Sequence, residues 1–168
     1  MTVVILGGLD DDHAVHMLNY LRERGTDTEL LDSRWFPSTL HLACDPVRGS
    51  WTLQLPEGRR LDGRQIRSVY WRCYNGIQRP NLPDDEQAFI GGNDARSLFE
   101  SLLIGLPVKW VNGWQAYQLH QTKPVQLAMV AALGVAVPET LLGNDAESVR
   151  AFAARHPRCV VGVLVLLR

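Results

Sequence analysis

The order of apolar and polar residues predicts a strand, a helix and a second strand at the start of the chain. Residues 2–6 and 28–31 are short apolar runs typical of buried strands. Between them, Ala14, Met17, Leu18 and Leu21 recur at the spacing of one helical face. The acidic residues at positions 10–12 supply a cap for this helix, and Gly25 ends it. The pattern predicts a right-handed βαβ unit with parallel strands.

Further elements follow in the middle of the chain. Residues 39–43 and 51–55 alternate as half-buried strands do, with a turn between them, which predicts a hairpin. Residues 61–66 are polar and predict a loop or short turn, whereas 68–73 and 108–111 have the composition of strands. A helix is expected to begin in 84–90, and a stronger one to follow Gly91 and Gly92.

The stretch 118–145 predicts one helix followed by one strand. Lys123 and Pro124 lie where the helix begins, and Gly134 ends it. Residues 135–142 are expected to be extended, and Asn144 to cap a helix over 145–156, before a last strand at 159–167. Lys123 is one of two lysines, and its charge opposes the helix dipole. Either an anion lies near Lys123 or it is an ordinary exposed lysine.

Composition limits the classes of function. The chain has 168 residues, 46% of them hydrophobic, and a net charge of -1, which suits one compact core or one domain plus a fragment. The charge argues against a nucleic-acid partner. A local basic run fits a solvated strand edge or, second, an anion-binding patch; it comprises Arg59, Arg60, Arg64, Arg67 and Arg72.

Cysteines and apolar runs indicate the compartment. The three cysteines, Cys44, Cys73 and Cys159, lack metal-ligand spacing, which fits reduced thiols in the cytoplasm. The longest apolar stretch, 160–167, is too short to cross a bilayer, so we expect a cytoplasmic protein.

Two early motifs allow alternative interpretations. Gly7 and Gly8 lie at a strand-to-helix turn where a nucleotide could bind, but the GxGxxG pattern is missing and the aspartates would repel phosphate. The aspartates at 10–12 could bind a metal together with His13 and His16, although helix capping explains them more simply.

The motifs of the stretch 118–145 resemble a known family. Lys-Pro-x-Gln-Leu at 123–127, Leu-Gly-x-x-Val-Pro-x-Thr-Leu at 133–141 and Asn-Asp at 144–145 are similar to the start of the ATP-grasp core in the maturases that crosslink microviridin-type peptides, the graspetides. Upstream pieces resemble the preceding N-terminal domain of those enzymes in the same order. They are residues 10–12, 20–22, 31–33, 36–37, 69–72 and 109–112.

The resemblance implies ATP-dependent ligation of a carboxylate to an amine or hydroxyl through an acyl phosphate, with ATP and Mg as cofactors. It places Lys123 near the nucleotide phosphates. The family has a second lysine on the strand at 159–164, and this chain has none there. The acidic residues that hold magnesium would lie beyond Arg168, so we expect no catalysis and little ATP binding by this chain alone. The family more often shows two adjacent arginines where Arg72 and Cys73 stand.

The combined prediction is an α/β protein. Residues 1–112 form a pre-ATP-grasp domain, with a Rossmann-like sheet and flanking helices, and 113–168 an incomplete start of an ATP-grasp core. The predicted function is the N-terminal portion of a ligase acting on ribosomally made peptides; the alternatives are a non-catalytic peptide- or partner-binding module, and a small-molecule enzyme using the Gly7-Gly8 turn. Expected partners are a precursor peptide or a full-length ligase, and a second copy of the chain through residues 159–167, with no nucleic acid and no membrane.

Overall fold

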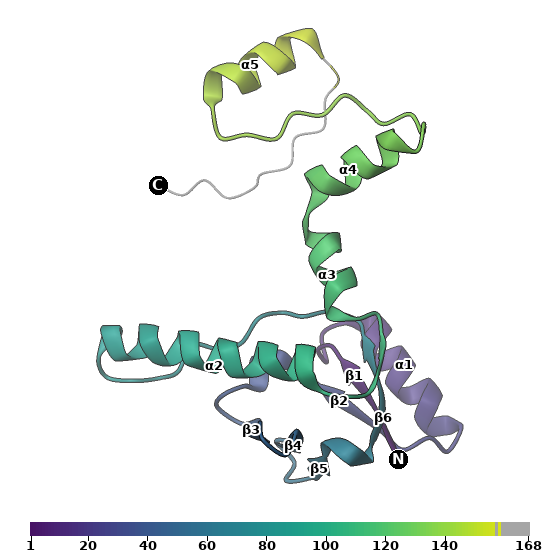
Figure 1. Ribbon diagram of the computed structural model, residues 1–168, viewed down its shortest axis with the longest axis vertical. Coiled ribbons are helices and arrows are strands. Elements are labelled where there is room, and N and C mark those ends of the chain that lie inside the picture. Colours follow the sequence, from purple (N-terminus) through teal and green to yellow (C-terminus); the bar gives the residue numbers. More distant parts are fainter. Residues whose placement is uncertain (157, 159–168) are drawn as a thin grey trace. The chain divides into compact units, whose positions relative to one another are not determined.

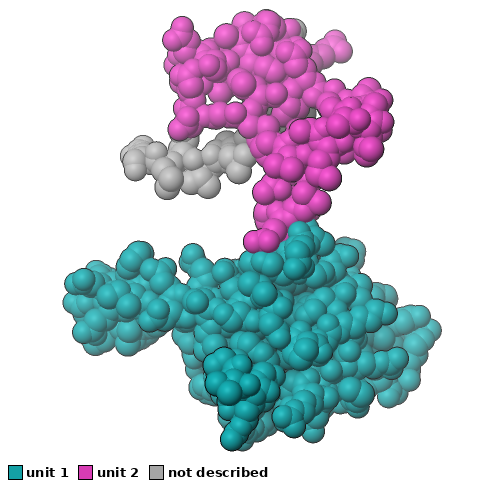
Figure 2. Space-filling view, in the orientation of Figure 1, with its two compact units in different colours: residues 1–117 teal, residues 118–168 magenta. Residues whose placement is uncertain are grey.

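The computed structural model describes residues 1–156 and 158. The chain divides into two compact units, Met1–Tyr117 and Gln118–Arg168 (Figure 2). This division falls within a helix, α3, whereas the boundary expected from the sequence lies between residues 112 and 113. The two units are described separately.

Unit 1 is built on a parallel sheet with the strand order β2-β1-β6-β7 (Figure 1). Its strands are β1 (Thr2–Leu6), β2 (Thr28–Leu31), β6 (Ile66–Trp71) and β7 (Lys109–Val111). All neighbours pair in parallel, with Ile5 opposite both Leu30 and Tyr70. The predicted α/β class and the opening βαβ unit are confirmed.

Helices cover both faces of this sheet (Figure 1). Ile5 packs with Ala14 and Leu18 of α1 (Asp12–Glu23) on one face. On the other face, the alternate residues of β1 join a larger core with Phe99 of α2 (Asp85–Gly105), which is completely buried. Because successive side chains of a strand point to opposite faces, one apolar run serves both layers.

The predicted cap of α1 is confirmed. Asp11 is the N-cap residue, and its carboxylate accepts hydrogen bonds from His13 N (2.9 Å) and Ala14 N (3.3 Å). These bonds satisfy two of the amides that the first helical turn leaves without partners. Capping therefore explains the presence of Asp11.

A second, antiparallel sheet contains β3 (His41–Asp45), β4 (Ser50–Gln54) and β5 (Arg60–Asp62). The β3–β4 hairpin confirms the prediction, with bounds shifted by one or two residues. The short turn predicted within 61–66 is present as the 3₁₀ turn η2 (Gly63–Gln65), but the segment is not all loop, because it also contains the end of β5 and the first residue of β6. Residues 60–62 form a strand because Leu61 is buried opposite Leu53, whereas its polar neighbours are exposed.

The α2 helix runs without a break through Gly91 and Gly92, so the two separate helical segments predicted here are wrong. A Cβ atom on Gly91 would lie 3.4 Å from Leu82 Cδ1, and one on Gly92 would lie 3.6 Å from Pro80 Cδ. Both distances are ordinary van der Waals contacts, so the preceding loop packs on this face of the helix without requiring glycine there. A shorter 3₁₀ turn, η1 (Ser33–Trp35), follows β2.

Helices α3 (Trp114–Gln121), α4 (Lys123–Ala132) and α5 (Ala146–Arg155) complete the described elements. The predicted start of α4 and its end at Gly134, which has a positive φ, are confirmed. The strand predicted after it is wrong, because residues 135–142 pair with no strand in the described part of the chain, and α3 was not predicted. Asp145, rather than Asn144, caps α5 by accepting from Ser148 N at 2.8 Å.

Two predictions concern residues outside the described ranges: the last strand with its missing second lysine, and self-association through 159–167. Over residues 1–156, no helix is both long and apolar enough to span a bilayer.

Candidate functional site

The carboxyl ends of β1 and β6 mark the point where the chain connections of the parallel sheet change direction. Ligands of open α/β folds commonly bind at such a point. Here, however, Arg72 N and Cys73 N both donate to Leu6 O, at 2.9 and 3.0 Å. A Cβ atom on Gly7 would lie 2.9 Å from Ala14 Cβ. The strand ends and α1 are therefore in close contact at this point.

Asp11 and Arg72 form an ion pair at this edge, with Arg72 Nε 3.1 Å from Asp11 Oδ2. Burial alone would raise the pKa of Asp11, but the Ala14 and His13 amides and the charge of Arg72 together lower it. Burial raises the pKa of the neighbouring Cys73 thiol. Cys73 therefore remains a thiol at neutral pH and is a poor nucleophile.

A second charged group surrounds Gly8. Arg34 Nε donates to Asp32 Oδ1 at 3.0 Å, and Arg34 Nη1 donates to Asp10 Oδ2 at 2.9 Å. Hydrogen bonds from Arg34 lower the pKa of Asp10, and the two carboxylates raise the pKa of Arg34. A Cβ atom on Gly8 would collide with Arg34 and Asp10. Gly8 therefore makes room for an ion-pair network, which removes the support for a small-molecule site at the Gly7-Gly8 turn.

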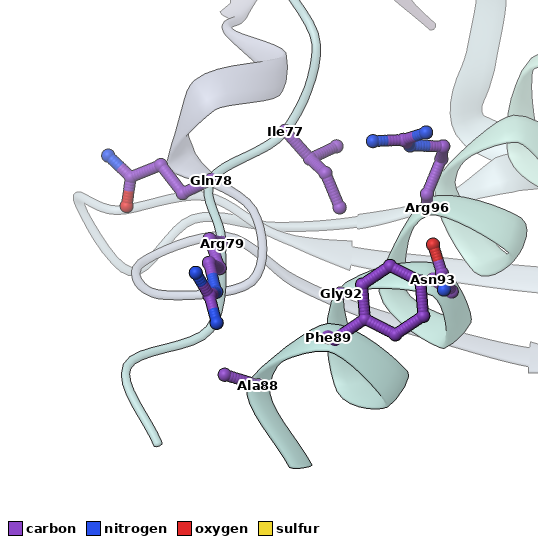
Figure 3. A pocket seen from close by; sticks show the side chains of 8 residues that line it. All are labelled: Ile77, Gln78, Arg79, Ala88, Phe89, Gly92, Asn93 and Arg96. Atoms are coloured by element: carbon purple, nitrogen blue, oxygen red, sulfur yellow. The ribbon is translucent and has the colours of Figure 1, made fainter. Parts of the chain in front are cut away.

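An open pocket of about 350 Å³ lies between residues 77–79 and the first half of α2 (Figure 3). Ile77 and Arg79 come from the loop, and Phe89 and Arg96 come from the helix. Phe89 is 66% exposed, although it is aromatic. Arg79 donates to Asp85 Oδ1 at 2.9 Å, and the cap and first turn of α2 are acidic. The pocket therefore offers an aromatic ring and two arginines to a ligand, and Arg79, one of the two, is paired with Asp85.

Lys123, the predicted nucleotide contact, is exposed at the first residue of α4 in unit 2. No side chain caps this helix, because Thr122 Oγ1 donates instead to Leu119 O at 2.9 Å. The first-turn amides therefore have no side-chain cap and point in the direction from which an anion could approach Lys123. An apolar groove of about 520 Å³ lies alongside, between α4 and the extended residues 137–142.

The structure separates the candidate residues of the sequence into different environments. Arg72 and Arg59 are paired with carboxylates, whereas Arg64 and Arg67 make no ion pair in the described part of the chain. Sequence reasoning missed the Arg34 network, although Asp32 and Arg34 stand two residues apart and the aspartates at 10–12 were noted. Among residues 1–156, no group of three His, Cys, Asp or Glu side chains is arranged to hold a metal ion.

No protein-family model matches the sequence, and no curated protein is significantly similar to it. Solved structures do match. The macrocyclase MdnB from Microcystis aeruginosa MRC is similar with a TM-score of 0.79 and 18% identity, over 92% of this chain and 51% of that one. The macrocyclase MdnC from the same organism, bound with precursor peptide MdnA, gives 0.77 and 19%, over 92% and 50%.

A third match has a higher identity. The ATP-grasp ligase PsnB, complexed with minimal precursor, Mg and ADP, has a TM-score of 0.67 and 26% identity, over 91% of this chain and 50% of that one. The chain therefore spans about half the length of the solved structures it matches. Its fold is that of the N-terminal region of RiPP macrocyclases and ATP-grasp ligases, and the predicted resemblance is confirmed at this level.

Proposed function

We propose that this chain acts as the N-terminal part of an ATP-grasp ligase that joins a carboxylate to an amine or hydroxyl in a ribosomally made peptide. The observation that carries the proposal is the likeness to peptide-modifying ligases over more than nine tenths of the chain, with Lys123 at the start of α4. Two of those ligases are described with a precursor peptide or a minimal precursor bound.

In this proposal, Lys123 contributes charge to nucleotide binding. Without an anion nearby, the ammonium group of Lys123 is unfavourable at the start of α4, because it opposes the helix dipole. A phosphate bound there would be attracted both by the ammonium group and by the amides that no side chain caps. When bound, ATP with Mg supplies the phosphoryl group that activates the carboxylate. The chain's own part is to hold and orient the phosphates, which lowers the barrier through positioning.

The two lysines of the chain make a direct test possible. An acyl-phosphate derivative of ATP transfers its acyl group to a lysine amine that lies beside the bound phosphates. We expect peptide mass spectrometry to find the acyl group on Lys123, and ATP with Mg to suppress the labelling. Lys109, which is also exposed, serves as the internal control.

Two outcomes would refute the role of Lys123. One is equal labelling of Lys109 and Lys123, and the other is labelling of Lys123 that ATP does not suppress. Because the label accumulates covalently, the experiment detects even weak binding. Lys123→Arg keeps the charge but removes the acylation site, so any labelling that persists in this variant and is not suppressed by ATP measures background reaction at other nucleophiles.

The peptide partner requires a separate test. Short peptides encoded beside the gene for this chain are the natural probes, labelled and titrated by fluorescence anisotropy. Saturable binding of one of them supports the proposal. Failure of all of them to bind, with selective labelling of Lys123 retained, would contradict the peptide as partner and leave a nucleotide-binding module.

A further inference from the structure

A pocket of about 350 Å³ opens at the amino ends of β6 and β7, on the edge of the sheet opposite to Arg34 and Arg72. Its floor is apolar and buried, with Trp51, Ile66 and Leu106 at 6, 3 and 4% exposure. Three exposed cationic side chains surround the opening: Arg64, Arg67 and Lys109. All of these residues belong to unit 1.

Local structure places each cation at the opening. Arg64 lies in η2, which Asp62 and Gln65 fix through a capping box. Arg67 and Lys109 come from neighbouring parallel strands, in which Lys109 stands opposite Ser68. A Cβ atom on Gly63 would lie 3.0 Å from Leu106 Cδ1, so the glycine lets η2 close onto the floor. The site is therefore built by elements that are far apart in the sequence.

Among the described residues, three cationic side chains without carboxylate partners lie at this pocket, whereas the pocket beside α2 has two arginines, of which Arg79 is paired with Asp85. Within residues 1–156, none of the three cationic side chains takes part in an ion pair, and no acidic residue lines the pocket. The nearest acid in the sequence, Asp62, uses its carboxylate to accept from Arg64 N at 2.9 Å. Cations that converge on a hollow repel one another, and an anionic partner relieves that repulsion.

The geometry points to a binding site for an acidic peptide segment. One apolar side chain enters the hollow above Trp51, and carboxylates on its neighbours meet Arg64, Arg67 and Lys109. The volume of about 350 Å³ lies at the lower end of the range of ligand pockets, about 300–1,000 Å³, and admits an apolar side chain. The choice of a peptide over a small carboxylic acid rests on the proposed function. The observations that the opening is cationic and that the floor is apolar are independent of that function.

Other anions fit this site less well. Nucleic acid needs a basic track along several phosphates, whereas the chain has a net charge of -1 and the cations surround one hollow. A free phosphate would meet the cations but would leave the apolar floor uncovered. Peptide segments in which acidic and apolar side chains alternate satisfy both parts of the pocket.

The test uses the full chain and a labelled peptide of alternating glutamate and phenylalanine, titrated by fluorescence anisotropy. We expect Arg67→Gln to weaken binding about tenfold, since a charged hydrogen bond contributes about that factor. Replacing all three cations by glutamine should weaken it about a hundredfold. Salt should weaken the wild-type interaction.

Matched controls separate a specific site from general attraction. Arg150→Gln removes the same charge from an exposed position of α5 and should leave affinity unchanged. The same peptide with glutamine in place of each glutamate should not bind. Circular dichroism of each variant verifies that the fold is retained.

Several results would overturn the inference. They are no saturation with the acidic peptide, equal affinity for the glutamine peptide, or an equal loss in Arg150→Gln. Displacement of the peptide by inorganic pyrophosphate at equal concentration would identify a free oxyanion site instead. Selective labelling of Lys123 by the ATP probe is independent of these variants, so failure here is distinguishable from failure of the nucleotide proposal.

Discussion

At the carboxyl edge of the parallel sheet, Arg34 and Arg72 each lie against carboxylates, whereas on the β6–β7 side of the amino edge the cations surround a pocket that no carboxylate lines. Both edges belong to the same sheet and carry the same kinds of side chain. The two edges differ in whether the positive charges are neutralised by carboxylates of the same chain. Paired charges connect neighbouring elements, and unpaired charges remain available to a partner. On this physical basis, the charged groups at the carboxyl edge stabilise the fold, whereas those on the β6–β7 side of the amino edge are the ones proposed to bind a partner.

The largest expected effect is at the carboxyl edge. Arg34→Ala leaves the Asp32 carboxylate, which is only 4% exposed, without its main partner. Because Arg34 itself is partly exposed, the pair is only partly buried, but its loss leaves a buried carboxylate behind, so this variant should lose more unfolding free energy than the others described here. Denaturant unfolding of the variant measures this loss. Arg67→Ala is the control at the amino edge, and equal losses in the two variants would remove the contrast between the edges.

A smaller loss is expected where β1 meets α1. Gly7→Ala would force a Cβ atom to within 2.9 Å of Ala14 Cβ, which overpacks the junction and costs about 2 kcal/mol. Gly92→Ala is the matched control, because its new Cβ atom meets only an ordinary contact at 3.6 Å in a helix interior. It should stabilise by about 0.5–1 kcal/mol. The prediction fails if both variants shift the denaturation midpoint in the same direction.

The amino edge is not uniform, and pH tests its paired part. Hydrogen bonds from Arg59 and Thr2 lower the pKa of Asp27 from 3.8 to about 2. Because the folded-state pKa lies below the ordinary value, the stabilisation by Asp27 is complete above pH 3.8. It is lost as the pH falls towards 2.

Comparison with Asp27→Asn isolates this contribution. The wild type should lose more unfolding free energy than the variant between pH 4 and pH 2, as followed by thermal unfolding at each pH. Parallel curves over that range would show that the Arg59 pair contributes nothing in solution. Because Asp27 is partly exposed, added salt should reduce the difference.

The smallest effect on stability belongs to the open pocket. Arg67→Gln should change the unfolding free energy by no more than about 0.5 kcal/mol, with the sign towards stabilisation, because it removes a like-charge contact without breaking a pair. The same variant should bind the acidic peptide less tightly. A clear loss of stability would show that Arg67 has a partner within the fold. In that case its charge would stabilise the structure, as the charges at the carboxyl edge do.

Local signals in the sequence determined several elements correctly. The apolar runs identified β1 and β2, the aspartates at 10–12 identified the start of α1, and Lys123 with Pro124 identified the start of α4. Each of these signals depends on neighbours within one or two turns. The motifs around Lys123 also indicated the ligase-like fold that the solved structures confirm.

Tertiary structure decided the rest. Leu61 became part of a strand because Leu53 lies opposite, and α2 continues through Gly91 because the residues on either side of it, such as Ala88 and Phe99, are buried in the core. The same holds for charge: the sequence shows a basic run but not which members are paired. Arg59 pairs with Asp27 across the fold, whereas Arg67 and Lys109 line one pocket only because β6 and β7 are neighbouring strands. Pairing depends on distances between residues remote in the chain, which only the folded sheet establishes.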